Sequence, residues 1–373
     1  MLRRPTLVTL TTTLATALAG GAAVAALVGP AEARPGLPAG QGACPPDAFA
    51  LGYSDGLDKA VVDGVTVGGL SDIAYDARRH AYASTVDNHA TDPSRIWWWR
   101  DNGQAHVVGG PLVLRAPDGT PYDGTTADDE GLAILPDGHL VVSSETEPSI
   151  RVFGRDGVQR AELPVPDRFR VAPAGEATAN ATLEGLTVTP NGRRVVAAME
   201  GTLSGDVAAD GTATYRRFLV YDHGRHGWRP TRQLGYQVDP GNRIAEVQAY
   251  GRDGLLVLEA AYQPATGNTI QLYAVHTRGA ADVTEVADLG DEPAEIMPKT
   301  LVADVTACPS MGAPAKEAQA NPLMDNFEGL TIGPVGSHHG RGGDRISTVT
   351  LISDDNFGVA QTTRVLRLAA RLP

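Results

Sequence analysis

A hairpin-like motif that recurs along the chain constrains its fold more than any other feature of the sequence. Three clear copies lie at residues 129–145, 183–200 and 327–357, and each contains the triplet Glu-Gly-Leu. In the first two copies an apolar run, a Pro-Asp-Gly or Pro-Asn-Gly turn and a second apolar run follow, which is typical of two antiparallel strands. Weaker copies begin near residues 69 and 245. The sequence is therefore a repeat of one β unit.

Further strand-like runs follow the hairpins, at residues 150–153, 218–221, 270–275 and 364–368. A hairpin with outer strands makes one blade of a β-propeller, so the sequence predicts an all-β propeller of five to six blades. The last hairpin is followed by one clear strand only, and we expect the segment at 49–53 to close the ring as the missing outer strand. A β-sandwich is the alternative, but it does not explain why the same hairpin recurs.

The N-terminal segment has the pattern of an export signal. Two arginines precede an apolar stretch at residues 7–28, and small residues surround the expected cleavage point after Ala33. The sequence predicts a signal peptide at 1–33, a linker at 34–47 and the propeller domain at 48–373. The chain is then secreted and has no membrane contact after cleavage. An uncleaved anchor helix is the alternative.

The net charge limits the classes of partner that the chain can bind, and the cysteine content indicates its redox environment. The chain has 44 Asp and Glu against 31 Lys and Arg, a formal net charge of -13. Excess negative charge repels phosphate backbones, so nucleic-acid binding is disfavoured, whereas cations or substrates that arrive with cations are favoured. Cys44 and Cys308 are the only cysteines, and in an exported monomer such a pair predicts a disulfide. Two free buried thiols are the alternative.

Acidic residues stand at both ends of the repeated hairpins. The predicted pairs are Glu130 with Glu145, Glu184 with Glu200, Glu246 with Glu259, and Glu328 with Asp354. The start of one antiparallel strand and the end of the next lie at the same edge, so we expect all pairs to meet on one face of the ring. Such crowding is unfavourable unless cations offset it, and oxygen ligands favour Ca²⁺. Alternatively, each glutamate accepts backbone N–H bonds from the next blade and braces the ring.

The copies at 129–145, 183–186 and 326–330, with Ser-Asp-Asp-Asn-Phe at 353–357 and the segment 68–76, resemble the phytase-like family, named for the esterase-like activity of phytase. The resemblance covers nearly all of the expected mature chain. It implies a secreted propeller that hydrolyses a small phosphoric or related ester. By wider analogy with β-propeller phytases, it implies Ca²⁺ held at the acidic face and attack by a metal-bound water.

The resemblance also implies roles for individual residues. For catalysis it indicates Asp354, Asp355 and Glu145, and for substrate phosphate Arg95 and Arg151. The expected metal ligands are Glu130, Glu184, Glu200, Glu246, Glu259 and Glu328.

Two other functions stay open. One is a non-enzymatic exported propeller that binds a ligand or a protein, and the other is a lactonase-type propeller hydrolase that also uses Ca²⁺. The sequence has no Gly-x-Ser-x-Gly elbow and no P-loop motif, so it gives no support to a serine-hydrolase triad or to a P-loop enzyme.

Overall fold

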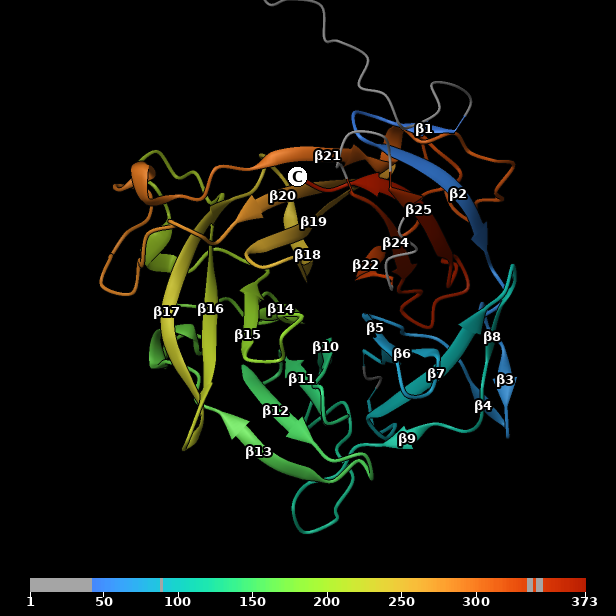
Figure 1. Ribbon diagram of the computed structural model, residues 1–373, viewed down its shortest axis with the longest axis horizontal. Coiled ribbons are helices and arrows are strands. Elements are labelled where there is room, and N and C mark those ends of the chain that lie inside the picture. Colours follow the sequence, from blue (N-terminus) through green and yellow to red (C-terminus); the bar gives the residue numbers. More distant parts are fainter. Residues whose placement is uncertain (1–41, 88–89, 334–337, 340–344) are drawn as a thin grey trace, which may run out of the picture. The chain divides into compact units, whose positions relative to one another are not determined.

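Five antiparallel sheets surround a common axis and form the ring seen in Figure 1. The computed structural model describes residues 42–87, 90–333, 338–339 and 345–373, which belong to one unit. The predicted signal peptide lies outside the described residues. Each sheet is one blade of a propeller, so the predicted all-β fold is confirmed and the number of blades is five.

In blades 1 to 4 the first four strands follow one another outward from the axis in chain order, and in blade 1 the additional strand β9 pairs with β7. Blade 1 contains β5 (Ile73–Asp76), β6 (Ala81–Thr85), β7 (Arg95–Asp101), β8 (Ala105–Val107) and β9 (Leu112–Val113). Blade 2 contains β10 (Asp129–Ile134), β11 (Leu140–Ser144), β12 (Ser149–Phe153) and β13 (Gln159–Leu163). Blade 3 contains β14 (Leu183–Val188), β15 (Arg194–Met199), β16 (Tyr215–Gly224) and β17 (Gly227–Gln237). Blade 4 contains β18 (Arg243–Tyr250), β19 (Gly254–Gln263), β20 (Gly267–His276) and β21 (Thr300–Asp304).

Blade 5 joins the two ends of the described chain. It contains β22 (Phe327–Ile332), β24 (Arg345–Ser353), β25 (Val365–Arg371), β2 (Ala48–Ser54) and β1 (Ala43–Cys44), with β23 (His338–His339) beside β24. The remaining elements are the hairpin β3 (Val61–Val62) and β4 (Val65–Thr66), and the short 3-10 helices η1 (Asp167–Phe169), η2 (Ser204–Asp206), η3 (Pro293–Glu295) and η4 (Val305–Ala307).

The N-terminal strand closes the ring as predicted. β2 pairs antiparallel with β25, from Ala48 opposite Ala370 to Ser54 opposite Val365. The first described strands therefore complete the last blade, and Figure 1 shows β2 beside β25 at the outside of the ring. Closure leaves the inner strands β5, β10, β14, β18 and β22 in one circle, in which each contacts the next.

The apolar core consists of five main clusters, one between each pair of neighbouring blades. The Trp97-Trp98-Trp99 run on β7 shows how strand alternation supplies two of them. Trp97 and Trp99 pack between blades 5 and 1, whereas Trp98 packs between blades 1 and 2. Successive side chains of a strand point to opposite faces, so each blade contributes apolar residues to both of its neighbours.

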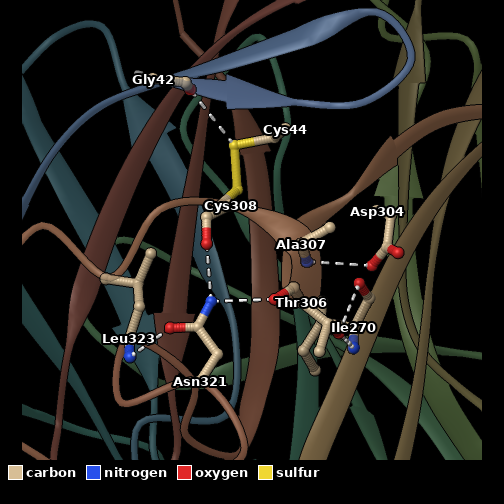
Figure 2. Close-up of a disulfide and its surroundings, with 9 residues drawn as sticks. All are labelled: Gly42, Cys44, Ile270, Asp304, Thr306, Ala307, Cys308, Asn321 and Leu323. Carbon is tan, nitrogen blue, oxygen red and sulfur yellow. Dashed lines mark hydrogen bonds between the residues drawn. A yellow bond between two sulfur atoms is a disulfide. The ribbon is translucent and has the colours of Figure 1, made fainter. Parts of the chain in front are cut away.

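The predicted disulfide is present and ties the closing segment to the connection between blades 4 and 5. Figure 2 shows Cys44 of β1 bonded to Cys308, which follows η4, with a sequence separation of 264 residues. The side-chain amide of Asn321 donates to the carbonyl oxygens of Thr306 and Cys308, each at 2.8 Å, and holds this loop in place. The free-thiol alternative is wrong.

A persistent disulfide is typical of an oxidising environment outside the cytoplasm. Among the residues that the structure describes, no helix is long and apolar enough to cross a membrane.

We expect reduction of Cys44–Cys308 to lower the free energy of unfolding by about 2–5 kcal/mol, because the bond closes a very long loop of the unfolded chain. Urea unfolding with and without reductant measures this difference. A chain carrying Cys44→Ser and Cys308→Ser is the control. Its free energy of unfolding should match that of the reduced protein and should not change when reductant is added. Equal stability of the oxidised and reduced chains would contradict this role.

Candidate functional site

The inner strands approach one another closely at the glycine of the repeated triplet, the third residue of the strand in blades 2, 3 and 5. A Cβ atom on Gly131 would lie 2.5 Å from the carbonyl oxygen of Glu184, and one on Gly185 would lie 2.8 Å from the backbone nitrogen of Val247. A Cβ atom on Gly329 would lie 2.9 Å from Cα of the next blade's Asp72. No side chain fits these distances, so the glycine of the repeated triplet is required by the packing of blade against blade.

Strand pairing fixes where the acids of each hairpin lie. In blades 2, 3 and 5 the register shifts at or next to the Glu-Gly pair, and such a bulge re-aims side chains. In blade 2 the leucine of the triplet, Leu132, pairs with Val142, three residues before Glu145. Glu130 stands two residues before that leucine. The same spacing brings the acids of blades 3 and 5 to the same end of the axis.

Blade 4 departs from this register by one residue. Val247 pairs with Val257, so Glu259 follows after two residues rather than three. Glu246 directly precedes Val247, at the position where blades 2, 3 and 5 have glycine. A one-residue offset turns a strand side chain to the opposite face. The two acids of blade 4, Glu246 and Glu259, therefore do not occupy the places that the repeated hairpin predicted for them.

Glu259 illustrates the consequence. Its buried carboxylate accepts hydrogen bonds from the Tyr236 hydroxyl and from Lys299 Nζ, both at 2.6 Å. It also accepts from the backbone N–H of Asp239 at 2.8 Å and from Asn242 Nδ2 at 2.9 Å. These partners all belong to blades 3 and 4 and their connections. The metal-binding role predicted for Glu259 stays a prediction, without contact to the other predicted ligands among the described residues.

Glu246 and Asp72 brace the ring. Asp72 accepts from the backbone N–H groups of Ile73 and Leu132, each at 2.6 Å, and Glu246 accepts from that of Leu186 at 2.8 Å. The two carboxyl groups also hydrogen-bond to each other, which requires a shared proton. Burial raises the pKa of Asp72 to about 7, and burial with the charge of Asp72 raises that of Glu246 well above its usual range. Asp72 and Glu246 thus accept backbone N–H bonds from a neighbouring blade, as the alternative to metal binding predicted for the acids of the repeat.

The remaining acids form a group, here called the acidic cluster, at the end of the axis where the inner strands begin. Its members are Asp87, Asp128, Glu130, Glu145, Glu184, Glu200, Glu328 and Asp354. Oxygen atoms of Glu130, Glu145 and Glu184 all lie within 4.8 Å of one another, and so do oxygens of Asp87, Asp128 and Glu130. Glu130 belongs to both groups. Asp87 and Asp128 were not among the predicted ligands, although Asp87 ends the second strand of blade 1 as Glu145 ends that of blade 2.

Burial and mutual repulsion favour the protonated forms of these groups. Burial, and then the neighbouring carboxylates, raise the pKa of Glu130 well above its usual range. Burial and the charge of Glu200 raise the pKa of Glu145 to about 8. Burial and a hydrogen bond with Asp128 raise the pKa of Asp87 to about 10. A divalent cation that displaced these protons would neutralise the same repulsion.

Arg243, at the start of β18, supplies a positive charge that the sequence analysis did not anticipate. Its Nη1 atom lies 2.9 Å from Glu184 and 3.2 Å from Glu200, and its Nη2 atom donates to Glu328 at 2.6 Å and to Asn326 at 3.2 Å. Burial lowers the pKa of Arg243, but the three carboxylates outweigh it and raise that pKa overall. Blade 4, which has Ala245 where blades 2, 3 and 5 have the glutamate of the triplet, thus contributes the counter-charge.

One family of known proteins matches most of this architecture. The sequence model described as phytase-like, esterase-like activity of phytase, matches residues 65–357. The chain belongs to the phytase-like family. The matched region contains all five inner strands of the phytase-like propeller and the whole acidic cluster.

Solved structures resemble the phytase-like chain only distantly. A virginiamycin B lyase from Staphylococcus aureus is 10% identical, with 84% of this chain and 72% of that chain covered and a TM-score of 0.33. A gluconolactonase from Xanthomonas campestris is 13% identical, with 87% and 89% covered and a TM-score of 0.38. No curated protein matches the sequence. These similarities are too weak to support a functional argument.

The two adjacent aspartates predicted to be catalytic have different surroundings in the phytase-like domain. Asp354 is buried beside Glu328, and burial followed by the charge of Glu328 raises its pKa well above the usual range. Asp355 points elsewhere, since it forms an ion pair with Lys59 and accepts from the backbone N–H of Gly69 at 2.8 Å. Asp354 therefore joins the acidic cluster, whereas Asp355 ties blade 5 to blade 1.

The two arginines predicted to hold phosphate form their ion pairs with carboxylates outside the cluster. Arg151 stacks over the Tyr122 ring at 4.7 Å and lies 4.0 Å from Glu162. Arg95 lies 3.5 Å from Asp92. Within the described part of the chain neither forms an ion pair with the acidic cluster, so their substrate-binding role stays a prediction.

Replacing Asp72 by alanine should weaken the ring. The change leaves the buried N–H groups of Ile73 and Leu132 without their acceptor, which costs about 1–3 kcal/mol for each donor left unpaired. Urea unfolding measures the loss, and Glu147→Ala, on the surface between β11 and β12, is the matched control. A loss no larger than that of the control would show that Asp72 does not brace the blades.

Replacing Arg243 by glutamine should destabilise the protein more at pH 8 than at pH 5. Folding raises the pKa of Glu184 and of Glu200, so their ionisation disfavours the folded state as the pH rises, and Arg243 offsets this. We expect a loss of about 1–3 kcal/mol at pH 8, the cost of leaving a buried group without its partner, and a smaller loss at pH 5. Urea unfolding of the variant at both pH values measures the loss of stability. The control is Arg194→Gln, which breaks the more exposed ion pair with Asp222. A loss in the Arg243 variant that does not depend on pH would contradict this role of Arg243.

Proposed function

We propose that this phytase-like propeller is an extracellular, Ca²⁺-dependent hydrolase of phosphoric or related esters, which acts at the acidic cluster. The observation that supports the proposal is the sharing of Glu130 between two groups of carboxylates whose oxygens lie within 4.8 Å of one another. Membership of the phytase-like family supports a hydrolytic reaction. The disulfide supports a location outside the cytoplasm.

The chemistry of the cluster fits a hard divalent cation. The candidate ligands Glu130, Glu145 and Glu184 supply oxygen atoms only, from the ends of strands that their blades hold rigidly. Oxygen donors of this kind suit Ca²⁺, which accepts six to eight of them in flexible geometry. Such an ion, when bound, acts as a Lewis acid on an ester oxygen.

The protein residues around the cluster would position the ester. Glu200 and Arg243 are partly exposed, with 17% and 25% of their side chains accessible, and Asp87 and Asp128 are half-buried, so an ester would reach the cluster past these residues. Arg243 is already held by three carboxylates, and no other ion pair to them is present among the described residues. A phosphate group would therefore depend on the cation rather than on arginine for its charge balance.

The same observation favours one competing function. Because Arg243 already compensates Glu184, Glu200 and Glu328, the cluster can serve as a rigid brace or a docking surface without chemistry. A non-enzymatic propeller of this kind would bind a ligand or protein at the acidic face. Turnover of any ester at an ordinary enzymatic rate would eliminate it.

We expect the mature protein to bind Ca²⁺ in calorimetric titration, and Glu130→Gln to weaken that binding by at least about tenfold because Glu130 serves both carboxylate groups. The control Glu147→Gln, which removes a charge from the exposed β11–β12 turn, should leave binding unchanged. Absence of Ca²⁺ binding by the wild-type protein would remove the metal site from the proposal.

Hydrolysis should be measured on phytate, a nitrophenyl phosphate, a nitrophenyl carboxylic ester and a lactone, with and without EDTA. We expect release of product from a phosphate ester that EDTA abolishes, and a loss of at least about tenfold in Asp354→Asn. Ca²⁺ binding without turnover of any of these compounds would support the non-enzymatic alternative. Turnover of the lactone alone would instead assign a lactonase-type reaction.

A further inference from the structure

Three arginines converge at the end of blades 1 and 2 that lies farthest along the strands from the acidic cluster. The turns at 77–80, 135–139 and 154–157 connect strands at this end of the ring. Between them is an open cavity of about 190 Å³, lined by the three arginines Arg78, Arg79 and Arg155 and by Asp76, Trp98, Leu112, Gly138 and Leu140. None of these residues takes part in the function proposed above.

Packing holds the arginines in this arrangement. The Arg79 guanidinium stacks over the Trp98 ring at 4.1 Å, and Arg78 donates to the carbonyl oxygen of Pro136 in the next blade. Gly138 lies between Arg78 and Arg155. A Cβ atom on Gly138 would lie 2.4 Å from Arg78 Nη1 and 3.0 Å from Arg155 Cδ. The backbone φ of Gly138 is +88°, which favours glycine, so the gap between these side chains is retained.

The nearest carboxylate balances one arginine only. Asp76 accepts from the backbone N–H groups of Arg78 and Arg79, at 3.0 and 3.3 Å, and its other oxygen lies 3.5 Å from Arg79 Nε. Both oxygens of the Asp76 carboxylate are therefore engaged by residues of the turn that follows it. No carboxylate among the described residues lies within ion-pair distance of the Arg78 guanidinium.

The carboxylates of the other two turns are engaged elsewhere. Asp137 pairs with His139 at 2.7 Å, and Asp156 pairs with Arg160. Within the described ranges Arg155 also has no carboxylate at ion-pair distance. Two exposed guanidinium groups that line one cavity therefore have no carboxylate partner among the described residues, in a chain whose formal net charge is -13.

We propose that this cavity is a binding site for a soluble phosphate-type oxyanion. Guanidinium groups present planar pairs of N–H donors that match the oxygens of phosphate and sulfate, and they remain charged at every physiological pH. A compact dianion between Arg78 and Arg155 would supply the missing counter-charge. Arg79, held on Trp98, would contribute a third donor group. The site is independent of the acidic cluster, so it stands or falls apart from the hydrolase proposal.

The test is calorimetric titration of the disulfide-bonded mature protein with inorganic phosphate, at constant ionic strength and with acetate as a monovalent comparison. A double variant, Arg78→Gln with Arg155→Gln, removes the two uncompensated charges. Its matched control, Arg193→Gln with Arg278→Gln, removes two charges from exposed turns of blades 3 and 4. Co-sedimentation with vesicles of phosphatidylglycerol, against vesicles of phosphatidylcholine, distinguishes a lipid headgroup from a soluble anion.

We expect saturable phosphate binding that the double variant weakens by at least about tenfold and that the control leaves within about twofold. Equal weakening by both variants would mean diffuse charge attraction and would overturn the site. Absence of saturable binding by the wild-type protein would overturn it as well. Binding to phosphatidylglycerol vesicles without binding of free phosphate would overturn the soluble ligand in favour of a membrane surface. Unchanged urea unfolding of both variants shows that any loss concerns binding and not folding.

Discussion

The close approach of neighbouring inner strands at the glycine of the repeated triplet is the constraint on which the site depends. Gly131, Gly185 and Gly329 have no room for a Cβ atom because the backbone of the next blade lies against each of them. The same contact brings the glutamate before each glycine to the axis. A carboxyl group so placed must accept backbone N–H bonds, keep a proton or find a cation, since burial without compensation is costly.

The ring uses the first two of these solutions in different places. Asp72 and Glu246 accept backbone bonds from neighbouring blades and share a proton. Glu130 is buried and Asp87 is half-buried, and both lie among other carboxylates. Two like charges about 4 Å apart repel by roughly 4 kcal/mol at an effective dielectric of 20, a large fraction of the stability of a domain. Protons, Arg243 and any bound cation therefore compete to relieve one common repulsion.

The acids of blade 4 are offset by a single residue from those of blades 2, 3 and 5, and this difference decides the charge distribution of the cluster. The offset removes Glu246 and Glu259 from the positions held by acids in blades 2, 3 and 5. Arg243 of the same blade reaches Glu184 of blade 3 and Glu328 of blade 5 instead. An arrangement of identical blades would have no such counter-charge. The departure from the repeat thus makes the acidic cluster compatible with a folded ring.

The sequence by itself determined the repeat, the all-β propeller, the closing strand, the cysteine pair and the gathering of acids at one end of the axis. These features follow from local patterns and from antiparallel connection, which the order of residues encodes directly. Tertiary structure alone decided that Asp355 faces Lys59 and that Arg243 compensates the cluster. The physical reason is that strand side chains alternate with a period of two. A bulge or a one-residue offset reverses the direction of a side chain, and pairing between strands, not the linear pattern, sets that register.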